Sequence, residues 1–151
     1  MADYSFVTEW RVPAPIDEVF AAIADSLRWP EWWRGVPSVE ELEAGDAAGL
    51  GNVRRYTFRS RLPYNLTFDV RTTLIQPPHA LDGIASGELT GEGRWRLAVE
   101  GDATVVRYEW DVCTTQWWMN LLAPLARPVF AWNHDVVMRQ GGEGLRRRLG
   151  V

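Results

Sequence analysis

Residues 53–114 form a series of alternating segments, and this alternation restricts the fold more than any other feature of the sequence. Segments 94–100 and 103–114 flank Gly101-Asp102, a dipeptide typical of tight turns, so they predict an antiparallel hairpin. In this hairpin, apolar residues pair with apolar residues on one face and charged residues pair on the other. A sheet with one buried side requires such a register. Counting back from the turn gives the apolar pairs Trp95–Tyr108 and Leu97–Val106 and the polar pair Arg94–Glu109.

The same alternation predicts further strands at 4–12, 36–42, 53–60, 66–74 and 81–89, of which 36–42 is weak. Pairing Phe58 with Phe68 brings the apolar faces of two of them together. We expect the second of these strands to place Leu66, Phe68, Val70, Thr72 and Leu74 on one face. Segment 81–89 carries small residues on one face, which leave space rather than fill it: Gly83, Ala85 and Gly87, between Leu81 and Leu89.

Helical patterns stand at both ends of this series. After the first strand, Pro15 begins a helix whose apolar stripe is Ile16, Val19, Phe20, Ile23 and Leu27. Pro30 ends that helix and begins a second short one, which carries Trp32 and Trp33. Residues 117–149 are helical, with breaks near Pro124 and Pro128, and His134 falls near the centre of the apolar face of the last segment.

This element order predicts an α+β fold in one domain, residues 1–151. We expect a curved antiparallel sheet of about six to seven strands wrapped around a long C-terminal helix. Two short helices follow the first strand. A helix that buries its apolar face against the concave side of such a sheet tends to enclose a hydrophobic cavity.

Composition excludes several classes of function. The formal net charge is −4, all 16 basic residues are arginine, and the acidic balance argues against a nucleic-acid-binding protein. One cysteine allows no intrachain disulfide, and two histidines with one thiol cannot build a common zinc site, so we expect no metal and no cofactor. No signal peptide and no membrane-spanning stretch are recognisable, which predicts a cytoplasmic protein without stable membrane insertion.

The chain resembles the START-like (helix-grip, SRPBCC) superfamily, and within it the polyketide cyclase/dehydrase and lipid-transport-like branch. The resemblance covers essentially the whole chain. It rests on "VPAPIDEVFAAIADSLRWPEWWRGV" at 12–36, the hairpin series, and "VFAWNHDVVMRQGGEGLRRRLG" at 129–150. It implies a deep cavity for a hydrophobic small molecule such as a lipid, polyketide or aromatic metabolite. Members range from carriers to cyclases, so the fold does not choose between them. The lack of lysine weakly indicates a high-GC, bacterial source.

His134 is the sharpest candidate for chemistry, because an imidazole that points into a cavity could transfer a proton or bind a ligand carbonyl. Tyr56 is a second candidate, and Asn133 could donate a hydrogen bond. For each of them a packing role in the core is an alternative. The predicted ligand-binding residues are Trp33, Tyr56, Phe58, Phe68, Trp95, Tyr108, Trp110, Phe130, Asn133, His134 and Met138.

Two tryptophan-rich stretches remain ambiguous in function. In "RWPEWWRG" (28–35), Trp29 and Trp32 are expected to stabilise the fold, whereas Trp33 could cover the mouth of the cavity. The stretch 117–132 could be a lid, a homodimer surface or a membrane contact, and we favour the lid.

The leading hypothesis is therefore the binding or carriage of a hydrophobic small molecule. The alternative is a cofactor-independent cyclase, dehydratase or isomerase that acts on a polyketide-like or steroid-like substrate. Because no inward carboxylate is predicted on the main strands, an acid–base pair is hard to assemble, which favours binding.

Overall fold

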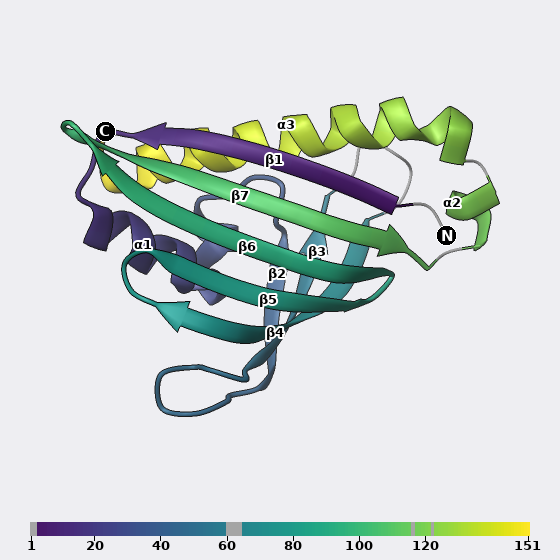
Figure 1. Cartoon of the computed structure of the whole chain (residues 1–151), viewed down its shortest axis with the longest axis horizontal. Helices are drawn as coiled ribbons and strands as arrows, with labels where there is room; N and C mark the ends of the chain where they lie inside the picture. Colours follow the sequence, from purple (N-terminus) through teal and green to yellow (C-terminus); the bar gives the residue numbers. More distant parts are fainter. Residues whose placement is uncertain (1–2, 60–64, 116, 122) are drawn as a thin grey trace.

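The computed structural model describes residues 3–59, 65–115, 117–121 and 123–151. Seven strands form one antiparallel sheet in the order β1-β7-β6-β5-β4-β3-β2, which curves around a long C-terminal helix (Figure 1). This arrangement confirms the predicted fold class. The strands are β1 (Asp3–Val12), β2 (Ser38–Glu43), β3 (Val53–Phe58), β4 (Leu66–Gln76), β5 (Ala80–Gly87), β6 (Leu89–Glu100) and β7 (Ala103–Thr114).

The hairpin of β6 and β7 has the predicted register. Trp95 pairs with Tyr108, Leu97 with Val106, and Arg94 with Glu109. Arg94 also forms ion pairs with Glu109 and Asp111 on the outer face, so the polar side of this hairpin is held by charges while the apolar side faces the helix. The turn at Gly101 has a positive φ of 61°, a conformation that glycine adopts without strain.

The register predicted for β3 and β4 is wrong by two positions. Tyr56, not Phe58, lies opposite Phe68, and Phe58 pairs with Leu66. A shift of two residues keeps every side chain on its face, so alternation alone cannot detect it. The connecting residues 60–64, which set the loop length, lie outside the described part of the chain.

Two details of β4 and β5 also differ from prediction. A bulge between Thr72 and Leu74 reverses the alternation, so that Ile75 instead of Leu74 packs against the core. Leu89 belongs to the start of β6, because β5 ends at Gly87.

The segment after β1 contains α1 (Ile16–Ala24) and a 3-10 helix, η1 (Ser26–Glu31). The helix α1 ends six residues before Pro30, which lies inside η1 instead of separating two helices. Leu27 is 38% exposed, because the α-helical spacing that predicted its burial stops at Ala24. Trp32 and Trp33 follow η1 and are not carried by a helix, although both are buried.

The C-terminal region contains α2 (Trp117–Leu121) and α3 (Ala123–Leu149). The predicted break near Pro124 agrees with the boundary between them, but Pro128 lies within α3 without ending it. The helix α3 runs along the sheet beside β1, with α1 near its C-terminal end and α2 at the opposite end (Figure 1). As expected for the apolar face that carries His134, Val137, Met138, Gly141 and Leu145 are buried, while Asp135, Arg139 and Glu143 are exposed.

Tryptophans attach α3 to the rest of the fold. Trp10 of β1 donates its indole N–H to the backbone oxygen of Met138 (3.0 Å), and Trp33 donates to that of Val137 (2.8 Å). Glycine makes this approach possible, because a Cβ at Gly141 would lie 2.6 Å from the Trp33 ring and 2.8 Å from the Trp10 ring. The glycine cluster in α3 therefore reflects close packing of indole rings against the helix backbone.

Thr104, at the start of β7, forms a hydrogen bond to the segment that leads into α1, and the contribution of this bond to stability can be tested. Its buried hydroxyl donates to the backbone oxygen of Ala14 over 2.8 Å. Replacing Thr104 with valine keeps the shape but removes the donor, so we expect the free energy of unfolding to fall by about 1–2 kcal/mol in urea titrations. The exposed Thr73→Val on β4 is the control and should change it by less than about 0.5 kcal/mol. Equal effects of the two substitutions would contradict this assignment.

Candidate ligand-binding cavity

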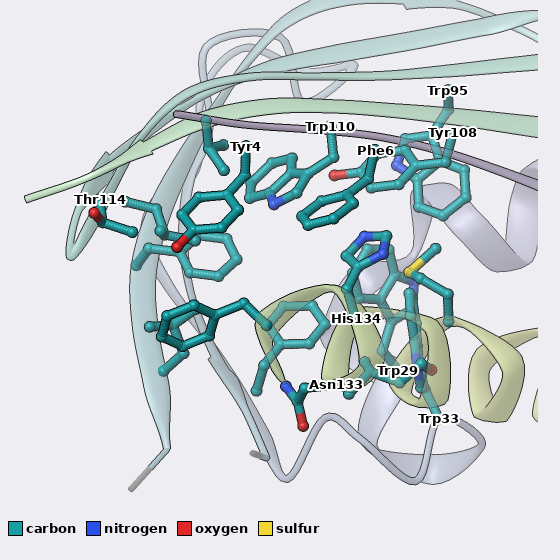
Figure 2. Close-up of a pocket in the computed structure, with 18 residues that line it drawn as sticks. Tyr4, Phe6, Trp29, Trp33, Trp95, Tyr108, Trp110, Thr114, Asn133 and His134 are labelled. Atoms are coloured by element: carbon teal, nitrogen blue, oxygen red, sulfur yellow. The ribbon is translucent and has the colours of Figure 1, made fainter. Parts of the chain in front are cut away.

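A cavity of about 120 Å³ lies between the concave face of the sheet and α3 (Figure 2). Side chains from β1, β3, β4, β6 and β7 form one wall, α3 forms the opposite wall, and Trp29 and Trp33 close one side. The lining is almost entirely aromatic and aliphatic, because inward-facing positions of the strands alternate with charged positions on the outside. The sequence pattern of the sheet therefore produces the apolar interior directly.

The structure brings ten of the eleven predicted ligand-binding residues together around this cavity. The exception is Tyr56, which lies in a second cavity beyond an aromatic wall. The ten residues are Trp33, Phe58, Phe68, Trp95, Tyr108, Trp110, Phe130, Asn133, His134 and Met138.

Eight further lining residues were absent from the sequence-based set of ligand-binding residues. Tyr4 has the same parity as the inward residues of β1, so the alternation of that strand was a usable signal for it. Trp29 lines the cavity as well as stabilising the fold, a double role that its position in the sequence does not reveal. The eight are Tyr4, Phe6, Trp29, Leu66, Leu89, Val112, Thr114 and Val137.

His134 lies on the cavity face of α3, and its ring stacks on Phe6 with 4.1 Å between ring centroids (Figure 2). Neither ring nitrogen has a hydrogen-bond partner among the described residues. Burial lowers the pKa of His134 to about 4, and the neighbouring Asp135 carboxylate opposes this only in part. The imidazole is therefore neutral at pH 7, with one N–H donor and one bare nitrogen acceptor.

Tyr4 contributes the second unpartnered polar group of the cavity. Its side chain is 7% exposed, and its hydroxyl has no hydrogen-bond partner among the described residues. Burial raises the pKa of Tyr4, while the nearby Arg127 guanidinium acts in the opposite direction. Arg127 lies over the tyrosine ring, 5.1 Å from its centroid, and donates to the backbone oxygen of Asp3 (2.6 Å). The cation thus lies over the ring but does not line the cavity.

A second cavity of about 140 Å³ lies nearer α1 and the loop between β2 and β3. Its polar groups already bind one another: the Tyr56 and Ser26 hydroxyls are 2.8 Å apart, and Arg54 donates to the Ser26 hydroxyl over the same distance. Burial raises the pKa of Tyr56, although the hydrogen bond to Ser26 partly opposes this. Six side chains line both cavities and separate them: Trp29, Phe58, Phe68, Trp95, Tyr108 and Trp110.

The small residues of β5 contribute less space than predicted. Gly83 lines the second cavity, but the side chain of Val70 occupies most of the place where its Cβ would stand. Ala85 and Gly87 line neither cavity. Close packing of large side chains against small ones is the physical reason, since protein interiors leave few voids.

Most of the described large side chains in the stretch 117–132 are exposed. Phe130 turns inward and lines the first cavity, so this part of α3 covers the cavity on one side. In the described part of the chain, no helix is long and apolar enough to cross a membrane. The exposed large side chains of the stretch are Trp117, Leu121, Leu125, Val129 and Trp132.

Comparison with known protein families identifies the family of this chain. The family described as "Polyketide cyclase / dehydrase and lipid transport" matches residues 12–139, which is most of the chain. The chain belongs to this family. The family lies within the START/Bet v1-like (SRPBCC) superfamily, which confirms the resemblance inferred from the sequence. No curated protein sequence matches the chain.

Solved structures support the fold at low sequence identity. The protein TTHA0849 from Thermus thermophilus has a TM-score of 0.75 at 16% identity, with 94% of this chain and 97% of that chain covered. The Zhui aromatase/cyclase from Streptomyces sp. R1128 has a TM-score of 0.71 at 17% identity, with 98% and 96% covered. A START superfamily protein from Mycobacterium smegmatis has a TM-score of 0.72 at 15% identity, with 97% and 95% covered. These similarities concern the fold alone.

Proposed function

We propose that this protein binds and carries a hydrophobic small molecule in the cavity between the sheet and α3. The observation that supports this most directly is the composition of the lining: an aromatic and aliphatic wall with a few polar groups, the usual character of a small-molecule site. The family to which the chain belongs includes lipid transport in its description, which agrees with this proposal.

The chemistry of the lining favours binding over the cyclase or dehydratase alternative. A general base works best when its pKa is near the working pH, and the pKa of His134 lies at about 4. None of the described residues that line the cavity is a carboxylate that could orient the imidazole or act as its partner. Tyr56, the other catalytic candidate, lies in the second cavity with its hydroxyl bound to Ser26.

Filling the cavity tests the proposal. Val112 of β7 is 4% exposed and lines the cavity, so Val112→Phe places extra ring volume in the space that the ligand would occupy. We expect the affinity for an uncharged fluorescent aromatic probe such as 2-naphthol, or for a molecule that co-purifies with the protein, to fall by at least ~10-fold. Fluorescence titration gives the first value, and native mass spectrometry reports the second.

Val99→Phe is the matched control, because Val99 lies near the end of β6 with 62% exposure and does not line the cavity. Its affinity should equal that of the unchanged protein. Circular dichroism verifies that both variants are folded. If Val112→Phe is folded and binds as tightly as Val99→Phe, the ligand does not occupy this cavity and the proposal is wrong.

A further inference from the structure

We infer that the cavity selects an uncharged aromatic ligand that carries a hydroxyl or carbonyl group, and that Tyr4 and His134 select it by hydrogen bonding. This inference rests on the proposed function and adds the chemical class of the ligand. It assigns to the two residues a role in specificity and not in catalysis. The observations that carry it are the positions of unpartnered polar atoms and the absence of charge in the described lining.

Unpartnered buried polar atoms concentrate at this cavity. Among the described side chains, four buried nitrogen or oxygen atoms have no hydrogen-bond partner, and three of them belong to Tyr4 and His134. The fourth belongs to Arg146, which does not line the cavity. Buried polar groups are normally hydrogen-bonded, and a missing bond is destabilising. A ligand with a matching polar group would restore these bonds, so the two residues can distinguish it from a purely apolar molecule.

The two residues lie in one row of rings. Tyr4 and His134 flank Phe6, whose ring is stacked with both, with centroid distances of 6.0 Å and 4.1 Å (Figure 2). Phe6 and Tyr4 are on β1 and His134 is on α3, so sheet and helix each supply one polar side chain to the lining of the same cavity. The flat rings beside these polar groups favour a ligand that is itself flat and aromatic.

The charge of the lining argues against an ionised ligand. None of the described residues that line the cavity is Asp, Glu, Lys or Arg, and His134 is neutral at pH 7. Arg127 is the cation beside Tyr4, but it lies over that ring without lining the cavity and donates to the backbone oxygen of Asp3. A carboxylate in this cavity would therefore lose its hydration without gaining a counter-charge.

The volume of the cavity limits the size of the ligand. The cavity of about 120 Å³ is comparable with an engineered cavity of about 150 Å³ that binds benzene, so it suits a ligand with one small ring system.

Three ligands that share one methylbenzene ring test the inference: toluene, p-cresol and p-toluate, which carry hydrogen, a neutral hydroxyl and a carboxylate at the para position. Isothermal titration calorimetry at pH 7.5 gives the dissociation constant of each. In a cavity that offers no hydrogen-bond partner, toluene would bind best, because a buried hydroxyl without a partner is unfavourable. We expect p-cresol to bind about five- to tenfold more tightly than toluene, and p-toluate to bind at least ~10-fold more weakly than p-cresol.

Variants assign the preference to the two residues. Tyr4→Phe removes one hydroxyl, keeps the ring beneath Arg127, and should lower the preference for p-cresol at least about threefold. The double variant Tyr4→Phe/His134→Phe should abolish it while toluene still binds. Tyr56→Phe is the matched control, since its hydroxyl is bound to Ser26 in the second cavity, and it should leave the preference unchanged.

The outcomes separate this inference from the proposed function. If toluene binds as tightly as p-cresol, or the preference survives in the double variant, the hydrogen-bonding role is wrong and water satisfies these groups. The proposed function stands in that case. If none of the three ligands binds to the folded protein, the cavity is not a ligand site and both proposals fail.

Discussion

Replacing Gly144 with alanine should lower the free energy of unfolding by about 3 kcal/mol or more, although glycine-to-alanine changes inside a helix usually stabilise by about 1 kcal/mol. The reason is the close approach of α3 to the segment after η1. A Cβ at Gly144 would overlap the backbone oxygen of Trp32, and a backbone atom cannot move aside as the end of a flexible side chain can. The helix would have to shift away from the tryptophans that hold it. Urea titration monitored by tryptophan fluorescence measures the effect.

Glu143→Ala is the control for this substitution, because Glu143 occupies the neighbouring position of α3 and is exposed. We expect its stability to change by less than about 0.5 kcal/mol. A Gly144→Ala protein that is as stable as the unchanged protein, or more stable, would show that α3 does not pack as closely against Trp32 as the structure indicates. A variant that does not fold at all agrees with the prediction.

Acid should destabilise the protein through His134 by about 3 kcal/mol between pH 7.5 and pH 4. Burial lowers the pKa of this side chain to about 4, whereas an unfolded chain has the ordinary value of about 6.5. As the pH falls below about 6.5, the unfolded state binds a proton that the folded state does not, so the unfolded state is favoured. Below about pH 4 the folded state is protonated too, and the loss stops increasing. The contribution of His134 is therefore fully present above the unfolded pKa and is lost as the pH falls.

His134→Phe isolates this contribution. The variant keeps a ring that can stack on Phe6 but has no group that titrates, so its stability should fall less on acidification. Urea titrations of both proteins at pH 7.5, 6, 5 and 4 give the difference in free energy of unfolding, in which the shared carboxylates cancel. Parallel pH profiles for the two proteins would mean that His134 is solvated in the folded state.

Most of the sheet could be predicted from the sequence because alternation decides which face of a strand is buried. The β6–β7 hairpin was predicted with its register, since a two-residue turn at Gly101 and Asp102 sets the count on both sides. The β3–β4 register was missed by two positions, because parity is the same for both registers and the loop length is not visible in the pattern. The bulge after Thr72 was not predicted either, because no particular residue type in the sequence marks the position of the extra residue.

The candidate site was predicted in part. Strand parity and the wheel of the last helix placed Trp95, Trp110 and His134 on faces that meet, and the structure gathers them around one cavity. The division of the interior into two cavities could not be predicted, because it depends on how the aromatic rings between them pack. Tyr56 illustrates this. It shares a strand face with Phe58, but Phe58 lines both cavities whereas Tyr56 lines only the second.

By itself, the sequence determined the fold class, the faces of the strands and the apolar character of the interior, since these follow from periodicity and from the cost of exposing apolar surface. Tertiary structure alone decided which polar groups lack partners. The pair Tyr4 and His134 lies 130 positions apart, and their environment depends on the packing of β1 against α3. The role of "RWPEWWRG" was also settled in three dimensions. Its tryptophans are buried, and Trp33 binds the backbone of α3 through an approach that glycine permits.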